Sequence, residues 1–179
     1  METKFIVSKL ISGGQTGADR GGLDVAIELG IPYGGKCPKG RKAEDGAIPA
    51  RYKLDEMSSA YYKKRTEHNV IESNATLIFT IGKPTGGTKL TVDYAVKHNK
   101  PFYIADLASP DDNNIAGHIC GWMENMNGGL NAVNVKKIPD NPIVNIAGPR
   151  ESKFPGIQER VKKILLIVFS GKVYPKGSE

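Results

Sequence analysis

The sequence predicts a single Rossmann-like α/β domain, in which helices cover both faces of a mostly parallel sheet and so form three layers. Two observations predict this fold class. Apolar segments of strand length alternate with helix-compatible segments along the chain, as in proteins built on a parallel sheet. Glycine-rich or charged turns follow three of the predicted strands. Such turns let backbone N–H groups at a helix start approach an anion.

The first half of the chain opens with a strand, a glycine-rich turn and a helix for which Thr16 is the predicted N-cap. Gly21 and Gly22 lie inside that helix, and we expect them to permit close packing of the helix on the sheet. The predicted elements of this half are a strand at 5–11, a turn at 12–19, a helix ending at Gly30, a strand at 31–35, a loop at 36–54 and a helix at 57–73.

The second half repeats the alternation. Its strand at 75–81 is almost wholly apolar, which is typical of a strand with helices on both faces. The remaining predicted elements are a turn at 82–88, a helix at 90–99, a strand at 102–107, a helix at 109–127, an edge strand at 131–137, a strand at 143–147, a turn at 148–153 and a helix from Pro155 to Gly171. We therefore predict one domain over residues 1–171 and a short tail at 172–179.

Composition narrows the classes of function. Glycine makes up 21 of 179 residues, above the roughly 7% that is typical, and its clustering suggests ligand loops. A net charge of +6 suits an anionic ligand, but it is too mild and dispersed to predict nucleic-acid binding. No apolar run is long enough for a membrane span. Two distant cysteines favour a reducing cytoplasm over disulfides. Three isolated histidines predict no protein-built metal site.

The turns after three strands should meet, because every β-to-α turn of a parallel sheet leaves its carboxyl edge. They offer backbone N–H groups, hydroxyls and cations suited to a phosphate. For the first turn, a tight connection without any ligand remains the alternative. The predicted ligand-binding residues on these turns are Ser12, Gly13, Gly14, Gln15, Thr16, Gly17, Asp19, Gly82, Thr85, Gly86, Gly87, Thr88, Arg150, Glu151, Ser152 and Lys153.

Catalytic machinery is not evident in the sequence. No serine stands in a G-x-S-x-G motif, and neither cysteine has a histidine nearby in the chain. Of the acids near the turns, Asp19 and Asp24 are expected to cap or solvate the first helix. Asp93 falls in the first turns of its own helix, where the dipole favours a carboxylate. We predict no catalytic residue.

Several motifs together resemble the "putative molybdenum carrier" family, which shares its Rossmann-like fold with lysine-decarboxylase-like phosphoribohydrolases. The matching segments cover most of the chain: SGGQTGADRGGLDVA (12–26), PKGRKAEDGAIPARY (38–52), RTEHNVIESNATLIF (65–79), PTGGTKLT (84–91) and NIAGPRESKFPGI (145–157). From these segments and the basic stretch before them, Lys36, Arg41, Arg65 and Asn69 complete the predicted site. The family usually has S-D-A-T where this chain has Ser73-Asn74-Ala75-Thr76.

The resemblance implies a non-catalytic carrier or storage protein for the molybdenum cofactor, a phosphorylated molybdopterin held as cargo. The alternative is an enzyme that hydrolyses the N-glycosidic bond of a nucleotide, as the phosphoribohydrolases do. Their P-G-G-x-G-T-x-x-E motif carries a glutamate, and Thr91 stands nearest to that position here. Relatives are generally homo-oligomers, so a dimer or tetramer is expected. The resemblance also suggests molybdoenzymes or cofactor-synthesis proteins as exchange partners.

Overall fold

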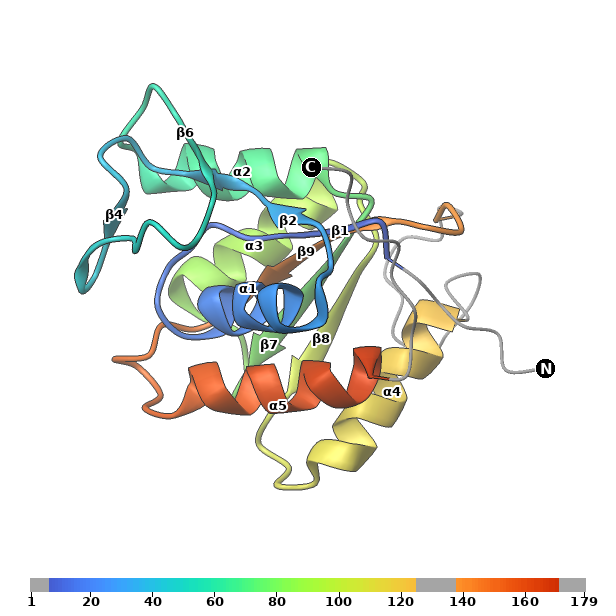
Figure 1. Cartoon of the computed structure of the whole chain (residues 1–179). Coiled ribbons are helices and arrows are strands. Elements are labelled where there is room, and N and C mark those ends of the chain that lie inside the picture. Colours follow the sequence, from blue (N-terminus) through green and yellow to red (C-terminus); the bar gives the residue numbers. More distant parts are fainter. Residues whose placement is uncertain (1–6, 125–137, 171–179) are drawn as a thin grey trace.

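The computed structural model describes residues 7–124 and 138–170, and it confirms a Rossmann-like α/β fold (Figure 1). The central sheet consists of β1 (Lys9–Ile11), β2 (Tyr33–Gly34), β7 (Ala75–Thr80), β8 (Phe102–Asp106) and β9 (Ile143–Ala147). The helices are α1 (Ala18–Leu29), α2 (Tyr62–Glu72), α3 (Gly86–Lys97), α4 (Asp112–Glu124) and α5 (Ile157–Phe169). Short strands β3 (Lys36–Cys37), β4 (Lys42–Ala43), β5 (Gly46–Ala47) and β6 (Asp55–Glu56) lie between β2 and α2.

The five central strands run parallel in the order β2-β1-β9-β7-β8. The last strand of the chain therefore lies in the middle of the sheet, between the first strand and β7. If β9 and α5 were moved ahead of β1, the strands would read 3-2-1-4-5 across the sheet, which is the order of the doubly wound Rossmann fold. The chain thus has a Rossmann sheet whose first βα unit is placed at the C-terminal end.

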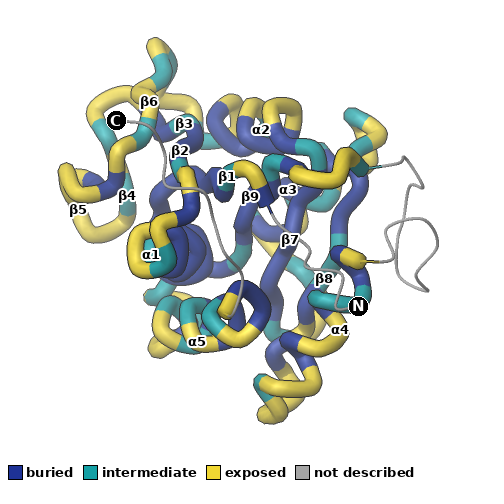
Figure 2. The backbone as a smooth tube through the Cα atoms, turned by 45° about the vertical axis from the view of Figure 1, so that its right-hand side comes forward, coloured by how far each residue is buried: buried dark blue, intermediate teal, exposed yellow. Residues whose placement is uncertain are grey.

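Helices cover both faces of this sheet. α1, α5 and α4 pack together on one face, whereas α2 and α3 cover the other (Figure 1). Every residue of β7 is buried, as its apolar sequence predicts, and the tube view shows this strand in dark blue through the centre (Figure 2). Gly21 and Gly22 confirm the predicted close packing. A Cβ on Gly21 would stand 2.7 Å from the carbonyl oxygen of Gln158 in α5, and one on Gly22 would stand 2.8 Å from Ile146 in β9.

The segment predicted as a loop at 36–54 is instead a small structured arm. β4 and β5 pair antiparallel, and β3 pairs parallel with β6. We call residues 38–56 the arm, and Figure 1 shows it extending away from the central sheet. Its outer surface is exposed, while Ile48 and Tyr52 are buried with Leu23 and Cys37 in a cluster of their own. That cluster fixes the arm against α1.

Some predicted boundaries need correction. The N-cap of α1 is Gly17, not Thr16, and no side chain caps the helix. α3 starts at Gly86, so the glycines predicted as turn form its first residues. Gly30 ends α1 in the left-handed conformation, with its N–H donating to Ala26 and Ile27, and this confirms the predicted helix end. The proposed edge strand at 131–137 and the tail at 172–179 lie outside the described residues.

The apolar stripe of α4 belongs to the core of this chain. Ile115, Ile119, Trp122 and Met123 are all buried within the domain. The Trp122 ring stacks on Tyr103 of β8, with ring centroids 5.5 Å apart. The stripe is therefore explained by packing inside one chain.

Candidate functional site

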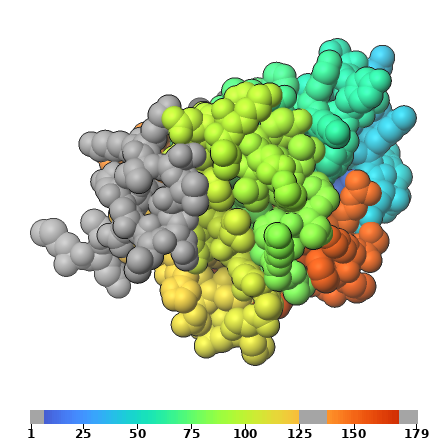
Figure 3. All heavy atoms as spheres, turned by 180° about the vertical axis from the view of Figure 1, so that it is seen from behind, coloured from blue at the N-terminus to red at the C-terminus, as the bar shows by residue number. Residues whose placement is uncertain are grey.

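A cavity of about 580 Å³ opens at the carboxyl edge of the sheet, within the usual size range of small-molecule sites. Its walls come from the start of α2, the first two turns of α3 and the β9–α5 turn. The lining residues are Tyr62, Lys63, Thr85, Gly86, Gly87, Thr88, Lys89, Leu90, Asp93, Gly148, Pro149, Arg150 and Lys153. In Figure 3 the orange atoms of the β9–α5 region lie beside the green atoms around α3 and below the cyan arm.

The position of this cavity follows from the sheet topology. β9 and β7 are neighbours, but β9 leads into α5 on one face and β7 leads into α3 on the other. Connections that diverge from adjacent parallel strands leave a crevice outside their carboxyl ends, and ligands of open α/β sheets bind there. The second and third predicted turns flank this crevice, so the sheet brings Thr85–Thr88 together with Arg150 and Lys153.

Positive charge predominates in the cavity lining. Four side chains are cationic, namely those of Lys63, Lys89, Arg150 and Lys153, and Asp93 is the one carboxylate among the lining residues. Asp93 pairs with Lys89 at 2.8 Å on the exposed face of α3. Among the described residues, no carboxylate forms an ion pair with the other three. The lining therefore suits an anion.

The start of α3 adds to this preference. Thr85 is the N-cap residue, but no side chain caps the helix. The first N–H groups of an α-helix have no partner within the helix, and its dipole favours an anion at this end. Gly86, Gly87 and Thr88 form this first turn and all line the cavity.

A smaller polar recess, of about 10 Å³, adjoins the cavity and shares Tyr62, Gly87 and Gly148 with it. Asp19, Arg65, Asn69 and Gly13 from the predicted site line this recess, together with Thr66, Thr91 and Asn145. Its volume corresponds to about one water molecule. Four predicted site residues thus meet beside the cavity and not in it.

Arg65 and Asp19 form a buried ion pair in this recess. The Arg65 guanidinium Nη1 lies 3.1 Å from Asp19 Oδ2, and both side chains are almost fully buried. Burial raises the pKa of Asp19, and the charge of Arg65 works against that shift. The Nε of Arg65 is buried without a hydrogen-bond partner among the described residues. Its Cζ lies 4.3 Å from the ring centroid of Tyr62.

The first glycine turn is packed and internally bonded. The N–H of Gly14 donates to Ser12 Oγ, and that of Gln15 donates to Asp19 Oδ2. A Cβ on Gly14 would stand 2.6 Å from Leu54 of the arm. In the described chain, Ser12, Gly14, Gln15, Thr16 and Gly17 are all buried and line neither the cavity nor the recess.

The residues of the β9–α5 turn have different contacts. Arg150 and Lys153 line the cavity, whereas Glu151 and Ser152 do not. The Glu151 carboxylate caps α5 by accepting hydrogen bonds from the N–H groups of Gly156 and Gln158. Ser152 is bonded to Glu44 of the arm.

The other predicted residues lie away from the cavity. Lys36 pairs with Asp55 at 3.2 Å. The Arg41 guanidinium donates to the carbonyl oxygens of Ile48, Pro49 and Tyr52, so it holds the arm together. The N–H of Gly82 donates to Asp106 at the end of β8.

Seven residues that line the cavity were missing from the predicted site, namely Tyr62, Lys63, Lys89, Leu90, Asp93, Gly148 and Pro149. Glu44, which lies outside the cavity but is bonded to the β9–α5 turn, was also missed. Lys89 directly follows the predicted turn at 82–88, and that position was a usable signal. Lys63 fell inside the predicted helix at 57–73, away from every predicted turn, and gave no such signal. Tyr62 gave no signal, because the start of α2 approaches the other turns only in the folded chain. Glu44 lies inside a segment that matched the carrier family, but its long-range partners are not visible in sequence.

Comparisons with known proteins give the family. Residues 10–169 match the sequence model of a protein family, the circularly permutated YpsA SLOG family (cpYpsA). The chain belongs to this family. The circular permutation in the family's name agrees with the strand order, because the C-terminal βα unit occupies the place of the first unit in the Rossmann sheet.

The chain is also similar to a solved structure, a "putative molybdenum carrier protein" from Syntrophus aciditrophicus SB. The two are 41% identical with a TM-score of 0.80, and the match covers 92% of this chain and 96% of the other. No curated protein matches the sequence. Within residues 7–124 and 138–170, no helix has the length and apolar character to cross a membrane.

Proposed function

We propose that the cavity between β9 and β7 binds a phosphorylated small molecule, with the molybdenum cofactor as its cargo. The observation that carries the proposal is the convergence of Arg150, Lys153 and the uncapped start of α3 on one cavity. These groups match the charge of a phosphate, and arginine can bind two of its oxygens at once. The name of the Syntrophus relative favours a molybdenum-containing cargo.

The chemistry of the lining fits this cargo. Phosphate would bind between the β9–α5 turn and the first turn of α3, where N–H groups and cations lie together. Tyr62 is the one aromatic residue among those lining the cavity, and it gives a flat ring system an apolar surface to contact. Lys63 and Lys89 extend the positive charge along the cavity. In this proposal these residues bind and orient the cargo.

The position of Thr91 supports a carrier over a hydrolase. Thr91 is buried, and its hydroxyl donates to the carbonyl oxygen of Gly87 at 3.1 Å. A hydroxyl committed to the backbone cannot replace the glutamate of the phosphoribohydrolase motif. Asp93 lines the cavity, but Lys89 holds it as an ion pair at its exposed edge. A homo-oligomeric state, exchange with molybdoenzymes and a cytoplasmic location remain predictions of the sequence.

The alternative function can be tested directly. The protein is incubated with a panel of nucleoside monophosphates, and the release of free base is followed by chromatography. A carrier releases none above the level of an Arg150→Ala variant. Base release that scales with the amount of wild-type protein and is lost in that variant would establish the hydrolase instead.

A further inference from the structure

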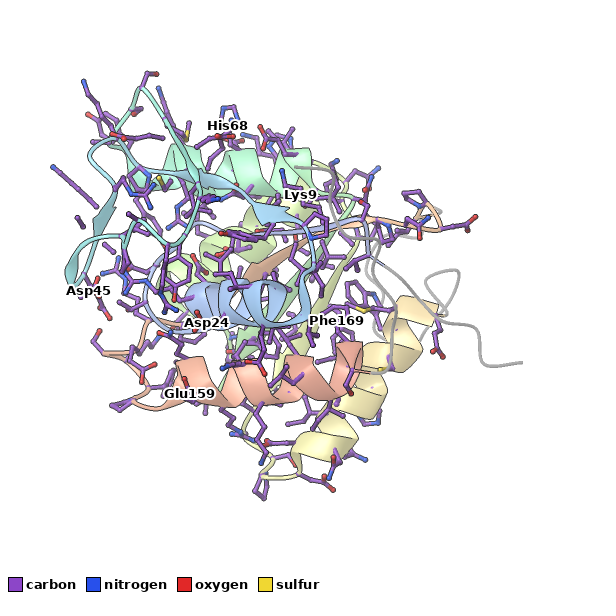
Figure 4. The ribbon with its side chains drawn as sticks, in the orientation of Figure 1. Lys9, Asp24, Asp45, His68, Glu159 and Phe169 are labelled. Carbon is purple, nitrogen blue, oxygen red and sulfur yellow. The ribbon has the colours of Figure 1, made fainter. Side chains whose placement is uncertain are left out.

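The tip of the arm carries two carboxylates that bind different elements. Asp45 forms a two-pronged ion pair with Arg20 of α1, with oxygen-to-nitrogen distances of 2.6 and 2.8 Å. Figure 4 labels Asp45 at the outer end of the arm. The adjacent residue, Glu44, reaches the β9–α5 turn instead. Two neighbouring side chains of equal charge thus hold one arm at two separate places.

Glu44 is bonded to three groups around that turn. Its carboxylate accepts hydrogen bonds from the Ser152 N–H at 3.1 Å, from the Ser152 hydroxyl at 2.5 Å and from the Thr16 hydroxyl. The oxygen of Thr16 in turn accepts the N–H of Glu151 at 3.2 Å. Burial acts to raise the pKa of Glu44, but the hydrogen bonds from Ser152 and Thr16 outweigh it and hold that pKa below its ordinary value.

The same turn presents its cations to the cavity. Arg150 and Lys153 stand on either side of the two N–H groups that Glu44 and Thr16 fix. Lys153 and Phe154 close the turn internally, since both N–H groups donate to the carbonyl oxygen of Arg150. Glu44 itself does not line the cavity, so it can act on a ligand only through the turn or as a nearby charge.

We propose that Glu44 is a positioning residue, which orders the β9–α5 turn so that Arg150 and Lys153 are held at the cavity. The inference rests on the proposed function for its effect on binding. The direction in which phosphate affinity changes when Glu44 is removed distinguishes this role from the alternatives. If Glu44 acted only as a nearby negative charge, or occupied the place of an anion, its removal would strengthen phosphate binding. If it orders the turn, its removal weakens phosphate binding.

The test compares Glu44→Ala with Asp45→Ala. Both variants remove one negative charge from the same arm tip, but Asp45 contacts α1 and not the turn. The first readout needs no ligand: hydrogen exchange at the amides of Lys153 and Phe154, which do not bond to Glu44. We expect exchange at both to speed at least about tenfold in Glu44→Ala and to stay at the wild-type rate in Asp45→Ala.

The second readout is the affinity for inorganic phosphate, followed by NMR of the Gly87 amide. Glu44→Ala should lower that affinity at least about fivefold, while Asp45→Ala stays within about twofold of wild type. Unchanged exchange at Lys153 and Phe154, or tighter phosphate binding by Glu44→Ala, overturns the role of Glu44. Wild-type protein that does not bind phosphate contradicts the proposed function instead, and the exchange rates still decide the role of Glu44.

Discussion

The ammonium of Lys153 donates a hydrogen bond to the hydroxyl of Thr85, the N-cap residue of α3. The two residues follow different strands, β9 and β7, which are neighbours in the sheet. Their contact joins the two turns that flank the cavity, and both residues line it. A cation and an uncapped helix start thus meet where an anion can contact both.

Removing these cations should weaken binding of a phosphorylated ligand and leave the fold intact. A charge-assisted hydrogen bond contributes roughly 1.5–3 kcal/mol, so Arg150→Ala and Lys153→Ala should each lower affinity by tenfold or more. Exposed charges contribute little to stability, and unfolding midpoints should match wild type. Calorimetric titration with the molybdenum cofactor measures the effect. Lys83→Ala is the control, because Lys83 is exposed in the β7–α3 connection but does not line the cavity. Equal affinity in all three variants would remove the β9–α5 turn from the site.

Gly17 is where we expect the first turn to be least tolerant of a side chain. Its φ is 84° and ψ is −131°, and a Cβ would stand 2.3 Å from the carbonyl oxygen of Pro149. Gly17→Ala should therefore lower the free energy of unfolding by more than about 2 kcal/mol, measured in urea. Gly30→Ala is the matched control, since Gly30 also has a positive φ but no atom within 4 Å of its Cβ position. It should cost about 1 kcal/mol. Similar losses of unfolding free energy in both variants would show that the short distance between Gly17 and Pro149 is not what excludes a side chain.

The bond between the arm and the β9–α5 turn should loosen in acid. The folded-state pKa of Glu44 lies below its ordinary 4.5, so the carboxylate stabilises the fold above that value and loses its contribution as pH falls through the folded pKa. The hydrogen bonds from Ser152 and Thr16, and after them the charge of Arg150, favour its charged form. Glu44→Gln cannot titrate, and below pH 4.5 its stability should fall less steeply than that of wild type. The measurement is urea unfolding as a function of pH. Parallel curves for the two proteins would show that Glu44 has no such linkage.

Strands that depend on local sequence were predictable. β7 was located to within one residue, because an unbroken apolar run is what a strand buried on both faces requires. The start of α3 was missed, since glycines are poor helix formers and Gly86-Gly87 was interpreted as turn. The arm was missed because its strands are only two residues long and lie among prolines and glycines.

The site was predictable only in part, for a topological reason. The three turns do share one edge of the sheet, but which of them are adjacent depends on the strand order, which the sequence does not give. The order β1-β9-β7 places the β9–α5 turn between the others, and the crevice opens on the β7 side. On the β1 side, Ile48 and Leu54 of the arm pack against Gly14. That contact joins residues far apart in sequence, and no local pattern reveals it.

The central claim is that this cavity carries the molybdenum cofactor unchanged, and native mass spectrometry tests it most directly. The protein is purified from cells that make the cofactor and, in parallel, from cells that cannot. We predict a species heavier than the 19.4 kDa chain by the mass of the cofactor in the first preparation and its absence in the second. The same species should be lost from Arg150→Ala. Wild-type protein from cofactor-making cells that shows only the bare chain mass would contradict the account.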